Sequence, residues 1–129
     1  MSYLVLFRCP SSVVETKARR FYLGEGLYAY VGSCGVSCHK RIARHLRRPA
    51  RRHWHVDYLP CEAVAAFATR LRESDLAARL SACAEYVKGF GSTDDRRAPS
   101  HLFKVGSLAQ LLDAISAVLH DKPGQAELR

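Results

Sequence analysis

The sequence predicts an α+β domain in which a small, mainly antiparallel β-sheet is flanked by helices. Short apolar and aromatic runs bounded by turn residues come first, at residues 3–8 and 27–33, as is typical of strands joined by tight turns. Apolar residues at helical spacing come later, at 73–86 and 107–120. The chain of 129 residues is 48% hydrophobic, which suffices for one core. We therefore expect a single domain over residues 1–121 and a C-terminal tail over 122–129.

The strands are predicted in chain order from their turn residues. Residues 3–8 are predicted as a strand that Cys9 and Pro10 bound, 19–23 as a second, weaker strand, and 27–33 as the clearest one. Residues 53–59 alternate in character and also predict a strand. The alanine-rich segment 61–70 fits either a helix or a strand, 88–95 is a loop, and 102–105 is a short strand. We expect three to five strands in the sheet.

Three helices are predicted, at 38–48, 73–86 and 107–120. In the first, Ser37 can cap the N-terminus and Pro49 ends the run. Ile42 and Leu46 lie one turn apart, so we expect them to face the sheet while the arginines face outward. The basic face should then lie next to Tyr30.

No apolar run approaches the ~18 residues that a membrane span needs. The N-terminus does not resemble a signal peptide, and the five cysteines lack the spacing of a secreted scaffold. We therefore expect a cytoplasmic protein with no membrane partner and at least one unpaired thiol. The high arginine content keeps open an intracellular disulfide of the hyperthermophile kind. A zinc site using Cys34 and Cys38 is a weaker alternative, because His53 and His55 are too close for the usual finger layout.

The positive charge is concentrated in one segment. The net charge is +8, and residues 26–56 contain no acidic residue. Such a block is typical of a surface that binds a polyanion, although a merely solvated basic face on a protein-interaction domain is an alternative. The residues expected to bind nucleic acid are Lys40, Arg44, Arg47, Arg48, Arg51 and Arg52.

Several motifs resemble those of the GIY-YIG nuclease superfamily. The run 30–33, Tyr-Val-Gly-Ser, followed by Arg41 and His45, resembles the second half of the family signature. Tyr3 is similar to the tyrosine of the first half, and its long separation from Tyr30 implies an inserted hairpin near residues 10–25. The motifs at 44–46, 54–59, 89–94 and 100–103 resemble an uncharacterised, mainly archaeal branch of the superfamily, classed as a domain of unknown function. The resemblance covers residues 2 to about 105.

The resemblance implies a metal-dependent endonuclease that hydrolyses DNA phosphodiester bonds in DNA repair. Tyr3 or Tyr30 would orient or deprotonate the attacking water. Arg41, with His45 nearby, would stabilise the phosphorane, and Glu73 would bind a single Mg²⁺ or Mn²⁺. Duplex or branched DNA is the expected partner, and a repair protein is a further candidate. The secondary site candidates are His55, Asp57, Asp94 and His101.

A second hypothesis is a non-catalytic nucleic-acid-binding module on a nuclease-like scaffold. It would use the same arginines and need no metal ion. His55 and Asp57 also have two interpretations. If 53–59 is a strand, both side chains face one side, and we favour a structural hydrogen bond between them over a catalytic role.

Overall fold

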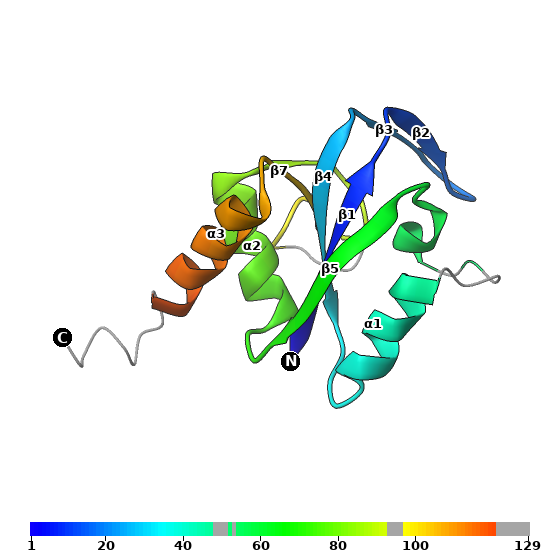
Figure 1. The fold of residues 1–129 in the computed structure, drawn as a ribbon. Coiled ribbons are helices and arrows are strands. Elements are labelled where there is room, and N and C mark those ends of the chain that lie inside the picture. Colours follow the sequence, from blue (N-terminus) through cyan, green and yellow to red (C-terminus); the bar gives the residue numbers. More distant parts are fainter. Residues whose placement is uncertain (48–51, 53, 93–96, 121–129) are drawn as a thin grey trace.

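The computed structural model describes residues 1–47, 52, 54–92 and 97–120, with the side chains of the last helix described as far as Ser116. Its centre is a five-stranded sheet in the order β5-β1-β4-β7-β6, in which every neighbouring pair is antiparallel (Figure 1). The strands are β1 (Ser2–Cys9), β4 (Gly26–Ser33), β5 (Glu62–Thr69), β6 (Glu85–Tyr86) and β7 (Leu102–Val105). The predicted α+β class is confirmed.

A separate two-stranded hairpin is inserted between β1 and β4. It pairs β2 (Ser12–Glu15) with β3 (Arg20–Leu23), which confirms the predicted insertion. Val14, Phe21 and Leu23 are buried in the core, while Val13 and Tyr22 face solvent on the other side of the hairpin. The alternation of the two strands therefore fixes the hairpin to the body of the domain.

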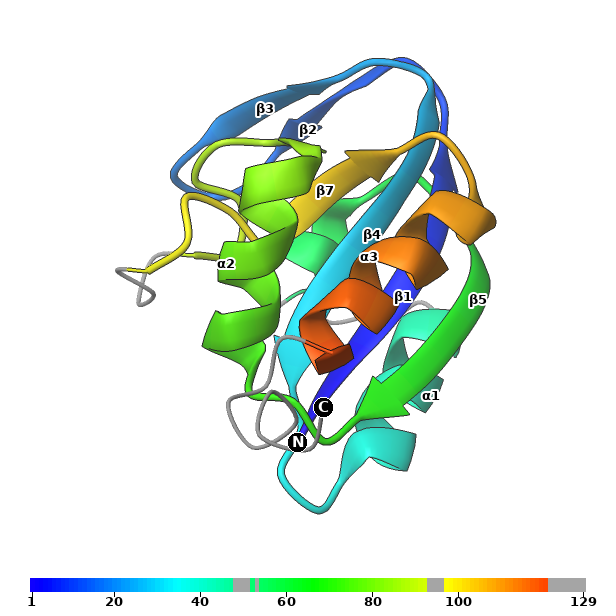
Figure 2. The same ribbon diagram turned by 90° about the vertical axis from the view of Figure 1, so that its left-hand side faces the viewer.

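The helices cover both faces of the sheet. Helix α1 (Cys38–Arg47) lies on one face, and α2 (Glu73–Cys83) and α3 (Leu108–His120) lie on the other (Figures 1 and 2). In β1, Tyr3 and Val5 belong to the core beneath α1, whereas Leu4 and Leu6 belong to the core beneath α2 and α3. The central strands are thus buried on both sides, which explains their nearly continuous apolar sequence.

The prediction that residues 53–59 form a strand is wrong. They contain a short 3₁₀ helix, η1 (His55–Tyr58), whose first turn is closed by a hydrogen bond from the Trp54 amide to the Asp57 carboxylate at 2.9 Å. Both edges of β1 are already taken by β4 and β5, so no position beside it is left for this segment. Local capping and tertiary pairing override the alternating pattern.

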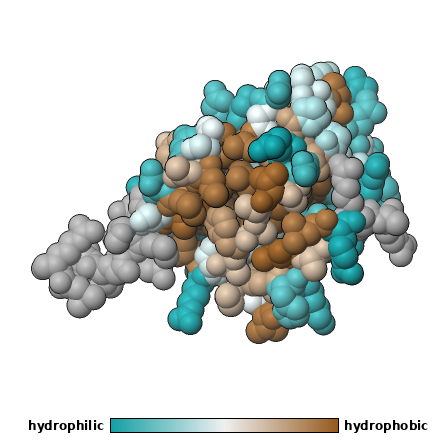
Figure 3. All heavy atoms as spheres, in the orientation of Figure 1, coloured by the Kyte–Doolittle hydropathy of each residue, from teal (hydrophilic) through white to brown (hydrophobic). Residues whose placement is uncertain are grey.

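Two other boundaries are settled by pairing within the sheet. The ambiguous segment 61–70 is strand β5, which lies at the sheet edge and pairs with β1 despite its alanines. The predicted helix 73–86 ends at Cys83, because Glu85 and Tyr86 pair with β7 as β6. Figure 3 shows that hydrophobic residues gather on the face of the molecule that carries β5.

The orientation predicted for α1 is only partly correct. Ile42 packs against the core, but Leu46 is 54% exposed. The helix instead buries Cys38 and His45, so its inward stripe runs through positions 38, 42 and 45. A polar contact of His45, described below, accounts for this rotation.

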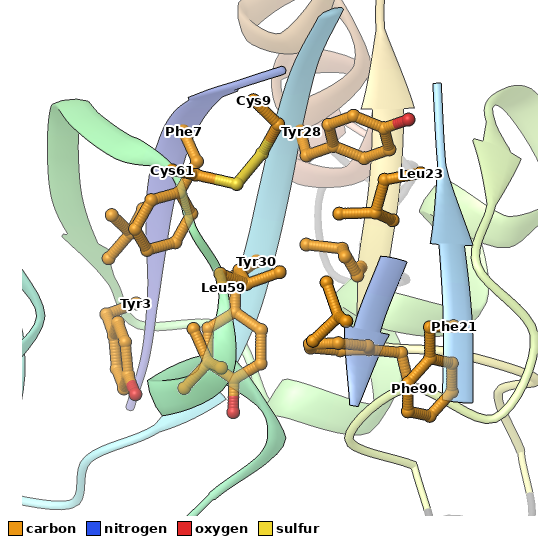
Figure 4. Close-up of a cluster of buried hydrophobic side chains, with 14 of the residues drawn as sticks. Tyr3, Phe7, Cys9, Phe21, Leu23, Tyr28, Tyr30, Leu59, Cys61 and Phe90 are labelled. Atoms are coloured by element: carbon orange, nitrogen blue, oxygen red, sulfur yellow. A yellow bond between two sulfur atoms is a disulfide. The ribbon is translucent and has the colours of Figure 1, made fainter. Parts of the chain in front are cut away.

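Four of the five cysteines form disulfides, Cys9–Cys61 and Cys34–Cys38, and Cys83 is an exposed free thiol. The first links the end of β1 to the segment that enters β5 (Figure 4). The second closes the turn between β4 and α1. The sequence had favoured reduced thiols, with a disulfide as the alternative, and the alternative holds. In the described part of the chain, no helix is long and apolar enough to cross a membrane.

Candidate active site

Two tyrosines from neighbouring strands meet beneath α1. Tyr3 of β1 lies opposite Gly32 of β4, and Tyr30 lies two residues before that glycine, on the same side of the sheet. The ring centroids of Tyr3 and Tyr30 are 6.3 Å apart, and both side chains are buried (Figure 4). The sheet therefore brings together the two tyrosines of the predicted site.

Gly32 makes room for this arrangement. A Cβ atom at position 32 would overlap the ring of Tyr3, which lies directly over the glycine. Any side chain here would push the Tyr3 ring away from Tyr30. The glycine of the Tyr-Val-Gly run is therefore needed for close approach rather than for an unusual backbone conformation.

His45 of α1 completes an aromatic group with the two tyrosines. Its Nε2 lies 2.6 Å from the Tyr3 hydroxyl oxygen, within hydrogen-bond distance. Its ring centroid is 5.3 Å from that of Tyr3 and 5.6 Å from that of Tyr30. This contact draws position 45 toward the sheet, which is why His45 rather than Leu46 is buried.

Burial sets the protonation states of this group. It raises the pKa of both Tyr3 and Tyr30 well above the usual value, so both are phenols at neutral pH. Burial, aided by the positive charges of Arg44 and Arg41 and opposed by Asp57, lowers the pKa of His45 to about 4. A neutral imidazole can accept a hydrogen bond at an unprotonated Nε2, so the Tyr3 hydroxyl can donate the hydrogen bond to His45.

We expect the lowered pKa of His45 to make stability depend on pH. Above about pH 6.5, His45 is neutral in both folded and unfolded chains, and its contribution to stability is complete. As the pH falls from about 6.5 to about 4, the unfolded chain binds the proton first, and the free energy of unfolding should fall by about 3 kcal/mol in total. Urea unfolding at several pH values measures this fall. In His45→Gln the fall should be smaller by most of that amount, and equal pH dependence in both proteins would contradict the assignment.

The arginines of α1 surround Trp54, which precedes η1. The guanidinium carbons of Arg41 and Arg44 lie 4.7 and 5.0 Å from the Trp54 ring centroid. Arg44 also donates a 2.9 Å hydrogen bond to the Asp57 carboxylate, whose side chain is fully buried. Arg44 and Asp57 therefore join α1 to η1, and this contact was not anticipated from the sequence. No local pattern predicts it, because Arg44 and Asp57 are 13 positions apart in the sequence and meet only when η1 folds against α1.

Glu73 begins α2 near the same end of the sheet. Its Oε1 lies 3.6 Å from Nδ1 of His101, a buried histidine that precedes β7. The charge of Glu73 raises and the charge of Arg41 lowers the pKa of both Tyr3 and Tyr30. Glu73 and Arg41 therefore both lie near the tyrosine pair. The side chain of Glu73 is 26% exposed and can reach a ligand.

Glu73 offers one carboxylate that a divalent ion could bind. Among the described residues, no group of three or more His, Cys, Asp or Glu side chains could hold a metal ion. A single carboxylate nevertheless fits Mg²⁺ or Mn²⁺, which retains several waters and takes its other ligands from substrate phosphates. Glu73 is thus the residue that would hold such an ion.

The secondary site candidates that the structure describes, His55, Asp57 and His101, do not form one cluster around Glu73. His101 contacts Glu73, as described above, whereas His55 accepts a 2.9 Å hydrogen bond at Nδ1 from the Gly91 amide and packs between Phe21 and Phe90. His55 and Asp57 thus have different partners on η1, contrary to the hydrogen bond expected between them on a strand. Asp94, Arg48 and Arg51 lie outside the described residues.

Sequence reasoning missed the part played by Gly91. This glycine has a φ of 68°, and a Cβ at its position would lie 3.4 Å from the Tyr30 ring and 3.5 Å from the Cβ of His101. Through the bond to His55, the loop that follows β6 is held against Tyr30. The Gly-Phe-Gly run at 89–91 was the available signal.

The basic residues of the first helix leave a positive surface beside the site. Lys40, Arg47 and Arg52 are exposed, and Arg52 lies 5.3 Å from the ring centroid of Tyr58. Arg41 and Arg44 are only half-buried. Cationic groups therefore extend from the solvent to the edge of the tyrosine cluster.

Comparison with known proteins identifies a family but no individual relative. No match is found among curated proteins, and none among solved structures. The family model described as "Domain of unknown function DUF123" matches residues 2–123, which include every described strand and the three helices of the fold. The chain therefore belongs to the DUF123 family.

Proposed function

We propose that the chain is a GIY-YIG-type endonuclease that hydrolyses DNA phosphodiester bonds with the help of a divalent metal ion. The observation that carries this proposal is the hydrogen bond between Tyr3 and His45, with Tyr30 beside it and Gly32 beneath the Tyr3 ring. These residues come from the two strands and the helix that carry the motifs of the resemblance. The proposed role in DNA repair rests on the resemblance alone.

Tyr3 and His45 can move a proton without forming a stable phenolate. As the Tyr3 oxygen accepts a proton from water, its own proton can pass to Nε2 of His45, which lies 2.6 Å away. The hydroxide that results would attack phosphorus as the bond to the leaving oxygen breaks. A bound phosphate would favour the imidazolium form of His45 and so raise its pKa during this step.

Arg41 and a metal ion at Glu73 would stabilise the negative charge of the reacting phosphate. Arg41 lies on the inner part of the basic helix and can donate hydrogen bonds to phosphorane oxygens. A metal ion held by Glu73 would supply Lewis-acid stabilisation of the leaving oxygen. Lys40, Arg47 and Arg52 would hold the flanking DNA backbone through its phosphates, together with the other predicted contacts.

A metal-dependent cleavage assay tests the proposal. Purified protein is incubated with duplex, flap, junction and single-stranded DNA, in Mg²⁺, in Mn²⁺ and in excess EDTA. We expect cleavage of at least one substrate in either metal and none in EDTA, with a dependence on metal concentration that saturates. Binding of the same substrates in EDTA is measured in parallel.

DNA binding without cleavage in any metal would contradict the nuclease proposal and leave the non-catalytic binding module. Cleavage that persists in EDTA would contradict the metal requirement. The absence of both binding and cleavage would favour a protein-interaction domain with an incidental basic face.

A further inference from the structure

A basic pocket, separate from the positive surface of α1, lies between the inserted hairpin and the β6 edge of the sheet. Its volume is about 620 Å³, within the usual range of small-ligand sites. Tyr28, Lys104 and Glu85 form a cross-strand row on β4, β7 and β6, and the hairpin residues 19–22 and the segment 87–88 also line the pocket. Figure 2 shows the hairpin beside β7 and the segment that leaves α2.

The lining carries excess positive charge. It contains four cationic side chains, Arg19, Arg20, Lys88 and Lys104, and one acidic side chain, Glu85. Arg20 forms an ion pair with Glu15 outside the pocket, at 2.7 Å. The other three cations can therefore meet an anionic ligand.

Glycines shape the pocket around two of these cations. A Cβ atom at Gly24 would lie 3.2 Å from Nζ of Lys104, and one at Gly89 would overlap the guanidinium of Arg19. Gly89 also has a φ of 79°, which a side chain rarely adopts. The positions of Arg19 and Lys104 are thus built into the backbone of the surrounding turns.

Two tyrosine rings are exposed in the same pocket. Tyr22 is 71% exposed and Tyr86 is 43% exposed. Large exposed aromatic rings beside cations are typical of surfaces on which nucleobases stack while the backbone phosphates are neutralised. The Tyr22 ring lies on the solvent side of the hairpin, where its hydroxyl interacts with Arg20 and most of the ring stays accessible.

We propose that this pocket binds unpaired nucleotides of a DNA strand, with bases on Tyr22 and Tyr86 and phosphates at Arg19, Lys88 and Lys104. The inference rests on the proposed function in taking DNA as the ligand. A duplex does not fit this chemistry, because its paired and stacked bases offer no free ring face. An added peptide strand does not fit either, because the edge strand β6 has only two residues.

The pocket lies close to the candidate active site. Tyr28 and Tyr30 are two residues apart on β4 and point to the same face, a spacing of about 7 Å. Unpaired DNA held in the pocket would therefore lie beside the tyrosine cluster, while duplex DNA is held by the basic helix α1. The enzyme would accordingly select junctions between single-stranded and double-stranded DNA.

Fluorescence anisotropy in EDTA tests this site separately from catalysis. The probes are labelled dT12 and a labelled 20-base-pair duplex. We expect Tyr22→Ala/Tyr86→Ala to weaken dT12 binding at least tenfold, because stacking contributes about 1–3 kcal/mol per base. Duplex affinity should change less than twofold. The matched controls are Tyr22→Phe/Tyr86→Phe, which keeps both rings, and Val13→Ala, which alters the residue paired with Tyr22 in the hairpin; both should bind dT12 like wild type.

Unchanged dT12 affinity in the double alanine variant, or an equal loss of dT12 and duplex affinity, would overturn the proposal. Thermal melting followed by circular dichroism checks that the variants fold. Should the double variant fail to fold, Lys88→Ala, at an exposed position, must weaken dT12 binding and reduce its salt slope by about 0.7, or the proposal fails. Loss of the proposed nuclease function would look different, since wild type would still bind dT12 in EDTA but would not cleave DNA in Mg²⁺.

Discussion

Replacing Glu73 by Gln should lower the rate of DNA cleavage at least about 1000-fold, equivalent to about 4 kcal/mol of transition-state stabilisation. The amide has nearly the same shape as the carboxylate but lacks the charge that would hold a divalent ion. Glu73 lies in the first turn of α2, so the loss of its favourable interaction with the helix dipole should cost only about 0.5 kcal/mol of folding stability. Initial cleavage rates at saturating Mg²⁺ and urea unfolding of the same preparation measure the two effects.

The matched control is Asp75→Asn, in the same turn of α2. Asp75 forms an ion pair with Arg97 and is not part of the candidate site. The substitution Asp75→Asn removes a carboxylate from the same turn of α2, so it has the same effect on the helix dipole as Glu73→Gln. Cleavage by this variant should stay within about twofold of wild type. Arg41→Ala should lower cleavage by about 100-fold to 1000-fold. If Glu73→Gln and Arg41→Ala both cleave like wild type, the proposed mechanism is wrong.

Removing the Cys9–Cys61 disulfide should destabilise the fold by about 4 kcal/mol. The two residues are 52 positions apart, and a crosslink over this distance restricts the unfolded chain strongly. Both cysteines are buried between β1 and the entry to β5, so Cys9→Ala/Cys61→Ala leaves little polar surface unsatisfied. Urea unfolding of this variant and of wild type under non-reducing conditions gives the difference in the free energy of unfolding.

The other cysteines provide graded controls for this experiment. Cys34→Ala/Cys38→Ala removes a crosslink over only four positions and should cost about 2 kcal/mol. Cys83→Ser changes an exposed free thiol and should alter stability by less than about 0.5 kcal/mol. Equal stability of wild type with and without dithiothreitol would show that neither disulfide contributes as expected.

Much of the architecture could be predicted from local patterns. The strands β1 and β4 carry apolar residues in nearly every position, and α3 has a clear helical spacing, so pattern and structure agree there. The segments that were mispredicted depend on partners far away in the sequence. Residues 85–86 form a strand because β7 offers them an edge. Residues 55–58 form a 3₁₀ helix because Asp57 caps the Trp54 amide and accepts a hydrogen bond from Arg44 of α1.

The sequence by itself determined which residues carry the candidate chemistry: two tyrosines, an acid-free basic block with Arg41 and His45, and one glutamate at a helix start. Tertiary structure alone decided how they meet. Antiparallel register places Tyr3 over Gly32, and the contact between His45 and Tyr3 turns α1 by one position away from the stripe that hydrophobicity favoured. The basic pocket likewise forms where the hairpin meets β6 and β7. The physical reason is that sequence periodicity reports which face of an element is apolar, whereas hydrogen bonds and crosslinks between distant residues decide which faces come together.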